Sequence, residues 1–184
     1  MIWLVTSNEG KFREIDLEMR KHGIGISWKK AKYSEIQGND NYEISLRSCQ
    51  DMAKTVHGTF FLEDTGLYCQ ALKGFPGPYA KYAYETIGPA GLIRQVGGLK
   101  RDAYFLTVVT LHHGGKNIQF DGKLEGTISS DERGGNGFGF DPVFIPKGEE
   151  RTLAEMTAEE KNGISHRAIA IRILIGYLEE NKIQ

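Results

Sequence analysis

The sequence is poor in the features that mark secreted, membrane-spanning or nucleic-acid-binding proteins. It has only two cysteines, Cys49 and Cys69, in 184 residues, which excludes a disulfide framework and favours the reducing cytoplasm. No apolar run approaches the roughly 20 residues that span a bilayer, and the start, MIWLVTSNEGK, turns polar after five residues, unlike a signal peptide. The 23 Lys and Arg nearly balance the 24 Asp and Glu, so the chain has no overall attraction for a nucleic acid polymer or an anionic membrane. We therefore expect a cytoplasmic protein with neither of these partners.

The common catalytic and cofactor motifs are missing as well. The sequence has no P-loop GxxxxGK[ST], no dinucleotide-binding GxGxxG and no GxSxG nucleophile elbow. No zinc-ligand spacing occurs, and the adjacent His112 and His113 at a predicted strand end project to opposite faces. The chemistry must therefore come from other segments.

The segments that are present predict an α/β fold. Early strand-helix units, a central run of strands and a final apolar helix are typical of an α/β chain with a mixed β-sheet. A length of 184 residues suits one sizeable domain or two small lobes that share a cleft. The expected strands cover residues 2–6, 59–62, 103–112, 118–120 and 124–129, with a hairpin turn at 114–115. The expected helices run from about residue 11 to Gly23, after 39–41, beside 88–89, and over 166–180. Cys49 lies on the apolar face of the second helix, where we expect a small core residue rather than a reactive thiol.

The segment TSNEGK, residues 6–11, lies between a predicted strand and a predicted helix. A strand that opens onto a helix N-terminus offers backbone N–H groups and a partial positive charge. Ser7 and Asn8 add side-chain hydrogen bonds, and Lys11 adds a full charge. This combination suits a phosphate group; the alternative is a capped helix start with an exposed lysine.

Three carboxylates, Glu35, Glu63 and Asp64, are candidates for metal binding. Glu63 and Asp64 are neighbours at the end of a predicted strand, so at most one of them easily faces a cleft. Carboxylates at the edge of a buried strand are costly unless they are solvated, paired or bound to a metal. Mg²⁺ typically takes one or two carboxylates together with phosphate oxygens and waters. An ordinary strand-end turn is the alternative.

A glycine-rich segment, GGNGFGFD at residues 134–141, combines two aromatic rings with an acid. Glycines let the backbone approach a planar ligand closely, and a ring face can stack on a nucleobase. The segment is therefore a candidate base-binding loop. Alternatively, it is a long hairpin whose Phe138 and Phe140 pack into the core.

The segment KNGISHR, residues 161–167, precedes the last predicted helix, which Ser165 can cap. His166 and Arg167 then lie in the first helical turn, where the helix dipole disfavours cations. Their placement favours contact with an anion or a carbonyl oxygen; a surface cluster is the alternative.

Taken in order along the chain, these segments resemble the inosine triphosphate pyrophosphatase family. The matching segments are TSNEGK (6–11), EDTGL (63–67), LKGFPGPY (72–79), GFGFDPVF (137–144), AEMTAEEKN (154–162) and SHR (165–167). The resemblance implies an elongated two-lobed α/β fold with a mixed β-sheet and a nucleotide-binding cleft between the lobes. It also implies a homodimer of a single domain over 1–184 that depends on Mg²⁺. The implied activity is hydrolysis of ITP, dITP and XTP to the nucleoside monophosphate and pyrophosphate.

The resemblance assigns a role to each matched position. The residues that hold the phosphates are Thr6, Ser7, Asn8, Gly10, Lys11 and Lys161. The metal ligands are Glu35 and Asp64, and Asp64 is also the general base; whether Glu63 or Asp64 binds the metal directly stays open. The residues that contact the remainder of the substrate are Thr65, Phe138, Gly139, Phe140 and Asp141, with the two rings beside the base. His166 and Arg167 read the oxygen-bearing edge of the purine.

One position departs from the family pattern, and two other functions remain open. Relatives often carry a lysine on the helix after the first acidic segment, where this chain has Arg47 and Ser48; arginine and lysine are not equivalent phosphate ligands. The first alternative function is a pyrophosphatase for modified pyrimidine nucleotides. The second is a non-catalytic purine nucleotide sensor, which would need neither Glu35 nor Asp64.

Overall fold

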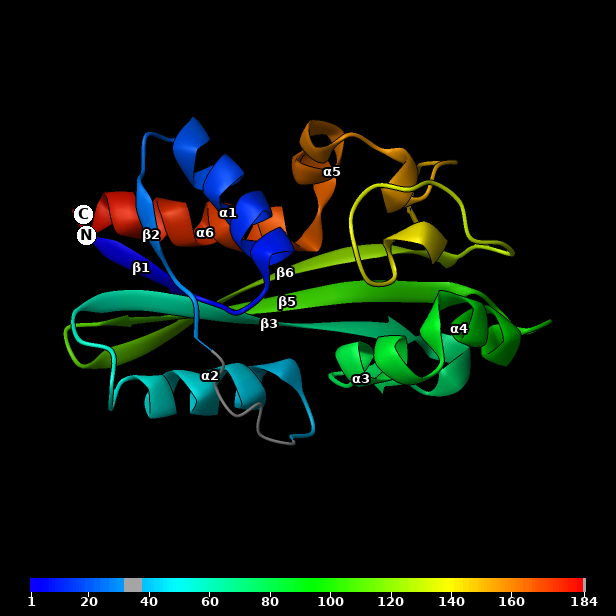
Figure 1. Ribbon diagram of the computed structural model, residues 1–184, viewed down its shortest axis with the longest axis horizontal. Coiled ribbons are helices and arrows are strands. Elements are labelled where there is room, and N and C mark those ends of the chain that lie inside the picture. Colours follow the sequence, from blue (N-terminus) through cyan, green and yellow to red (C-terminus); the bar gives the residue numbers. More distant parts are fainter. Residues whose placement is uncertain (32–37, 184) are drawn as a thin grey trace. The chain divides into compact units, whose positions relative to one another are not determined.

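The computed structural model describes residues 1–31 and 38–183 (Figure 1). The chain forms two compact units. Unit 1 comprises Met1–Asp64, Thr107–Gly122 and His166–Gln184, and unit 2 comprises Thr65–Leu106 and Lys123–Ser165. The strands form a mixed sheet in the order β2-β1-β3-β5-β6-β7, with β4 paired to β3. Strand β1 is parallel to β2 and β3, and β7 is antiparallel to β6. The prediction of an α/β chain with a mixed sheet is confirmed.

The strands, α-helices and 3₁₀ turns have the following bounds. The strands are β1 (Ile2–Val5), β2 (Ile26–Lys29), β3 (Thr59–Cys69), β4 (Pro76–Gly77), β5 (Asp102–His113), β6 (Lys116–Ile128) and β7 (Phe144–Pro146). The α-helices are α1 (Glu9–Lys21), α2 (Asn41–Met52), α3 (Ala80–Thr86), α4 (Gly88–Val96), α5 (Ala158–Ile164) and α6 (His166–Glu180). Short 3₁₀ turns cover Gln70–Leu72, Asp141–Val143 and Leu153–Glu155.

Unit 1 has an apolar core on each face of its strands. Helices α1 and α6 pack together on one face, and α2 lies on the other (Figure 1). The first core joins Leu4, Ile15 and Ile171 with their neighbours. The second contains Phe60 and Cys49 with their neighbours. Because both faces are covered, the strands of this unit are rich in apolar residues on both sides.

Cys49 and Cys69 are both buried and not in a disulfide. Burial raises the pKa of each thiol to about 12. A thiol with such a pKa is almost wholly protonated at neutral pH and therefore a poor nucleophile. The expectation that Cys49 is a core residue is confirmed.

The helix boundaries follow from local capping. Asn8 caps α1, because its side chain accepts a hydrogen bond from the backbone N–H of Lys11 at 3.1 Å. At the other end Gly23 has a φ of +72°, and its N–H donates to the carbonyl of Arg20. Such a left-handed residue ends helices commonly and favours glycine. The predicted helix to Gly23 is therefore confirmed, as is the predicted helix over 166–180.

Two strand predictions were wrong. Strand β3 was expected to stop before Glu63 and Asp64, but it continues to Cys69. It tolerates the two acids because Glu63, which is buried, has cationic partners. Residues 118–120 and 124–129 were expected to be separate strands, but they belong to one strand, β6. The glycine between them marks a close backbone contact instead of a turn.

That glycine, Gly122, lets α6 approach β6. A Cβ atom at residue 122 would lie 2.1 Å from the carbonyl oxygen of His166 and 2.5 Å from the backbone nitrogen of Ala170. We expect Gly122→Ala to lower the free energy of unfolding by about 1–3 kcal/mol, because backbone atoms of a packed helix must shift. Urea denaturation measures the change.

Gly176, within α6, provides the matched control. A Cβ at residue 176 has no atom within 4 Å, so Gly176→Ala is expected to stabilise the protein by about 0.5–1 kcal/mol through helix propensity. Equal stability of Gly122→Ala and wild type would contradict the close approach of α6 to β6.

Unit 2 has its own apolar core. The cluster includes Leu67, Leu92, Phe105, Phe144 and Leu153. In this unit β6 pairs with β7. Capping boxes at Thr152 and Thr157 begin the 3₁₀ turn Leu153–Glu155 and helix α5. Within the described residues, none of the helices is both long and apolar enough to cross a membrane.

Candidate active site

The predicted phosphate-binding segment forms the turn between β1 and α1. The backbone N–H of Asn8 donates to Thr6 Oγ1 at 3.1 Å, and the indole N–H of Trp28 donates to the Thr6 carbonyl at 2.8 Å. These bonds fix the turn from both sides. Thr6 is buried, Ser7 and Asn8 are exposed and Gly10 is half-buried. The turn therefore presents polar groups at the N-terminal end of a 13-residue helix, where an anion is stabilised.

A buried network of charges lies beside this turn. Lys11 Nζ lies 2.8 Å from Glu63 Oε1, and Arg167 Nε lies 3.5 Å from the same oxygen. Arg167 Nη1 also donates to Glu14 Oε2 at 2.5 Å. The side chains of Glu63 and Arg167 are 0% and 3% exposed, and that of Lys11 is 21% exposed. Two carboxylates thus balance two cations in a place where an unbalanced charge would be costly.

Asp64, the next residue along β3, has a different environment. It is half-buried, and its Oδ2 accepts a hydrogen bond from Asn41 Nδ2 at 2.6 Å. Asn41 is fully buried as the first residue of α2, which Asp40 caps. Since neighbouring strand residues face opposite ways, Glu63 points into the ion network and Asp64 toward α2. Asp64 is consequently the better placed of the two acids to meet a solvent-borne ligand.

Glu35, the other predicted metal ligand, lies outside the described residues. Within residues 1–31 and 38–183, no three His, Cys, Asp or Glu side chains gather as a metal cluster. Mg²⁺ does not require one, because it is often held by one or two carboxylates, substrate phosphates and waters. An oxygen ligand such as the partly accessible Asp64 suits this hard cation.

His166 begins α6 and is 3% exposed. Its Nδ1 lies 2.6 Å from Oγ1 of Thr107, a fully buried residue of β5. The preceding Ser165 ends α5 in an extended conformation, with a ψ of 150°. His166 and Arg167 are therefore neighbours in the first turn of α6, each with a polar partner from another element.

A second group of predicted site residues lies in unit 2. Lys161 Nζ lies 2.5 Å from Asp141 Oδ2 and 4.8 Å from the centroid of the Phe138 ring. The same Asp141 oxygen accepts the backbone N–H of Phe138 at 2.8 Å. Asp141 thereby links the α5 lysine to the glycine-rich loop and holds an ammonium over an aromatic face, a favourable cation–π arrangement.

The two phenylalanines of the loop have different positions. Phe138 is half-buried, whereas Phe140 is 3% exposed and packs edge-on against Tyr84 with ring centroids 5.8 Å apart. Gly139 has a φ of +64° and lies between them. Thr65, half-buried, is the first residue of unit 2. The core packing predicted as the alternative thus describes Phe140, while Phe138 is the more accessible ring.

The structure therefore collects the predicted residues into two sets, one in each unit. The unit 1 set contains Thr6, Ser7, Asn8, Gly10, Lys11, Asp64, His166 and Arg167. The unit 2 set contains Thr65, Phe138, Gly139, Phe140, Asp141 and Lys161. In each unit a cation of the set makes a short contact with a carboxylate, Lys11 with Glu63 in unit 1 and Lys161 with Asp141 in unit 2. The predicted cleft between two lobes stays a prediction.

Comparison with known proteins places the chain in a family. The profile of the Ham1 family matches residues 2–177. The chain belongs to the Ham1 family. It is 45% identical to a dITP/XTP pyrophosphatase of Thermococcus kodakarensis over 178 residues, which are 96% of each chain. It is 41% identical to a dITP/XTP pyrophosphatase of Pyrococcus horikoshii, over 98% of this chain and 97% of the relative. The family resemblance found in the sequence motifs is confirmed.

Solved structures of Ham1 proteins have the same fold. A HAM1 protein from Coxiella burnetii matches with a TM-score of 0.82 and 29% identity, over 98% of this chain and 100% of the other. The Ham1 protein of Staphylococcus aureus matches with a TM-score of 0.81 and 26% identity, over 97% and 99%. The fold of this Ham1-family chain is thus shared with Ham1 proteins of known structure.

Sequence reasoning missed the partners of the predicted residues in this Ham1-family chain. Glu14 binds Arg167 across 153 positions of sequence, and Asn41 binds Asp64 across 23. One signal was present: Glu14 stands three positions after Lys11, on the same face of the predicted helix. Arg47 and Ser48 stand where relatives often carry a helix lysine. Arg47 pairs with Glu43 on the surface of α2 at 2.6 Å, and Ser48 is buried.

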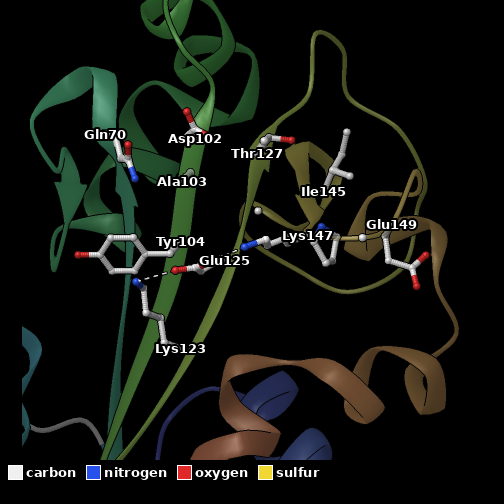
Figure 2. A pocket seen from close by; sticks show the side chains of 13 residues that line it. Gln70, Asp102, Ala103, Tyr104, Lys123, Glu125, Thr127, Ile145, Lys147 and Glu149 are labelled. Carbon is white, nitrogen blue, oxygen red and sulfur yellow. Dashed lines mark hydrogen bonds and ion pairs between the residues drawn. The ribbon is translucent and has the colours of Figure 1, made fainter.

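Figure 2 shows a pocket of about 370 Å³ in unit 2 of this Ham1-family chain that contains none of the predicted site residues. Lys123 Nζ lies 3.1 Å from Glu125 Oε1 and 4.4 Å from the centroid of the Tyr104 ring. Lys147 Nζ lies 3.4 Å from Glu125 Oε2. The hydrogen bond from Lys123, followed by that from Lys147, lowers the pKa of the Glu125 carboxyl. Asp102 and Glu149 also line the pocket, so its carboxylates outnumber its two lysines and it lacks the excess positive charge that would favour a polyphosphate.

Proposed function

We propose that this chain hydrolyses ITP, dITP and XTP at the α–β phosphate bond, giving the nucleoside monophosphate and pyrophosphate. The observation that carries the proposal is the unit 1 set, in which Lys11 of the helix start and Arg167 share a buried ion network through Glu63, and the half-buried Asp64 is the next residue along β3. The dITP/XTP pyrophosphatases that match nearly the whole chain support it. Neither alternative function is favoured by any of these findings.

The phosphates would bind at the turn before α1. Backbone N–H groups of the first helical turn and the side chains of Ser7 and Asn8 donate or orient hydrogen bonds there, and Lys11 adds a positive charge. Lys161 is proposed to contact phosphate as well, and Asp141 fixes its ammonium. Attack on an anionic phosphoryl group is disfavoured by repulsion, and cations placed in this way reduce it.

Asp64 is proposed as the general base. A carboxylate can orient the attacking water and accept its proton, and the hydrogen bond from Asn41 holds Asp64 in one orientation. Asp64 and Glu35 would hold Mg²⁺, which when bound neutralises phosphate charge and makes a bound water more acidic. No covalent nucleophile is required.

The choice of base would come from His166 and Arg167. Hypoxanthine and xanthine present an oxygen acceptor at the 6-position, whereas adenine presents an amino donor. A guanidinium only donates hydrogen bonds, so Arg167 would pair with the oxygen and face an unmatched donor in adenine. A site whose buried polar groups lose their partners rejects the wrong ligand strongly. The Phe138 ring is proposed to lie against the base, with Phe140 and Thr65 supporting the substrate.

The assembly and location that go with this function are also proposals. We propose a homodimer of a single pyrophosphatase domain over 1–184, located in the cytoplasm. The family resemblance supports the dimer, and the two reduced, buried cysteines agree with a reducing compartment. Light scattering coupled to size-exclusion chromatography tests the dimer; a monomer mass of 20.6 kDa at micromolar concentration would contradict it.

Product analysis tests the activity. The purified chain is incubated with ITP, XTP, ATP, GTP and dUTP, each with and without Mg²⁺. We expect pyrophosphate and the monophosphate from ITP and XTP only with Mg²⁺, and a kcat/KM for ATP lower by at least about a hundredfold. Release of orthophosphate from ITP would refute the proposed bond cleavage. A preference for dUTP would favour the pyrimidine alternative, and tight ITP binding without turnover would favour the sensor.

A further inference from the structure

Thr107 has a buried hydroxyl that has no role in the proposed mechanism. It lies on β5, is 0% exposed, and its Oγ1 is 2.6 Å from His166 Nδ1. Bulk water cannot replace this contact, because Thr107 is fully buried and His166 is 3% exposed. A short hydrogen bond between two buried groups restrains the plane of the imidazole ring, and the direction of the bond is linked to the position of the ring proton.

The backbone of His166 is fixed independently of this side-chain bond. Gly122 on β6 brings the strand so close to the His166 carbonyl that no side chain fits at residue 122. The neighbouring Arg167 is held by Glu14 and Glu63. With the backbone fixed by β6 and α1, the hydrogen bond with Thr107 bears on the orientation of the His166 ring itself.

The proton on the His166 ring decides which purine it can recognise. A neutral imidazole has one N–H donor and one acceptor. If the Thr107 hydroxyl donates to Nδ1, the proton resides on Nε2, which then donates a hydrogen bond, as a 6-oxo purine requires. If Nδ1 carried the proton, Nε2 would accept, as the 6-amino group of adenine requires.

We propose that Thr107 is a positioning residue that donates its hydroxyl proton to Nδ1 of His166, sets the Nε2–H tautomer and thereby determines the preference for oxo-purines. The inference rests on the proposed function for the identity of the substrate. The contact itself, between β5 and the first turn of α6, does not depend on it.

Two substitutions at residue 107 separate hydrogen bonding from packing. Thr107→Val keeps the shape and removes the hydroxyl, and Thr107→Ser keeps the hydroxyl. We expect Thr107→Val to lower the ratio of kcat/KM for ITP over ATP by about tenfold, the effect of one lost hydrogen bond in a buried recognition site. We expect Thr107→Ser to restore the ratio to within about threefold of wild type.

Thr110→Val is the matched control on the same strand. Thr110 is also 0% exposed, and its hydroxyl lies 2.6 Å from Ser45 Oγ, away from His166. This variant removes an equally buried hydroxyl, so it reproduces any general loss of stability. We expect it to leave the ITP to ATP ratio unchanged. An equal fall of the ratio in Thr110→Val and Thr107→Val would overturn the proposal.

A second readout requires no turnover. In ¹⁵N-histidine-labelled protein, with the His166 signals identified by His166→Gln, long-range ¹H–¹⁵N spectra report the tautomer of the ring. We expect a single Nε2–H form in wild type and Thr107→Ser and a mixture in Thr107→Val. If wild type does not hydrolyse ITP, the proposed function fails while this spectrum still decides the role of Thr107. An Nδ1–H form in wild type, or an unchanged spectrum and ratio in Thr107→Val, overturns the inference.

Discussion

Replacement of Asp64 by asparagine is expected to lower kcat for ITP hydrolysis about a thousandfold, within the range that a positioned general base contributes. The amide keeps the size of the carboxylate and can still accept the hydrogen bond from Asn41, so the fold should be retained. It cannot take the proton of the attacking water, and it is a weaker ligand for Mg²⁺. Pyrophosphate release at saturating ITP and Mg²⁺ measures the loss.

Asp121→Asn is the control for this substitution. Asp121 lies exposed on β6 in the same unit, and the same chemical change there should leave kcat within about twofold, as surface changes usually do. The midpoint of urea denaturation should be the same for both variants as for wild type. Retention of more than a tenth of the wild-type kcat by Asp64→Asn would exclude Asp64 as the base.

Glu63→Gln is expected to lower the free energy of unfolding by about 3 kcal/mol, because it removes one partner from a buried ion network. Without the Glu63 charge, Lys11 loses the carboxylate 2.8 Å from its ammonium while Arg167 keeps its pair with Glu14, so an excess of positive charge remains in a dry environment. Urea denaturation at neutral pH measures the difference. Glu9→Gln, which removes an exposed i,i+4 ion pair with Arg13, should change stability by less than about 0.5 kcal/mol.

A double variant separates the loss of the Glu63–Lys11 attraction from the effect of the uncompensated Lys11 charge. Glu63→Gln combined with Lys11→Met leaves Arg167 and Glu14 as a balanced pair, so it should recover part of the stability lost in Glu63→Gln alone. If the double variant is less stable by the sum of both single changes, the two side chains do not interact, and the 2.8 Å contact would contribute nothing to the fold.

The sequence predicted those parts of the fold whose causes are local. Helix α6 has apolar residues on most sides and α1 has a capping asparagine and a terminal glycine, and both were predicted well. The extension of β3 through Glu63 was not, since two adjacent acids normally end a strand. The acids are accommodated by Lys11 and Arg167, which are distant in sequence from β3, and no local pattern contains that information.

The candidate site, too, was predicted where its features are local in sequence and missed where they depend on distant residues. The segments 6–11 and 161–167 were recognised from residue types and order along the chain. Their partners were not, because Glu14 reaches Arg167, and Asn41 reaches Asp64, only after the strands and helices have packed. Thr107 is an ordinary strand residue in sequence, and its bond with His166 across 59 positions is a consequence of the sheet.

The contact of Lys11 with Glu63 has a consequence for how nucleotides arrive and leave. The ammonium already has a carboxylate neighbour, so any phosphate must compete with that carboxylate. Small anions such as orthophosphate, which bring charge but no base, gain little from such a site and are released readily. Under the proposed function, only a ligand that also engages His166 and Arg167 through its base offsets the competition, so the Glu63 carboxylate would protect the site from abundant inorganic ions and from the departing pyrophosphate.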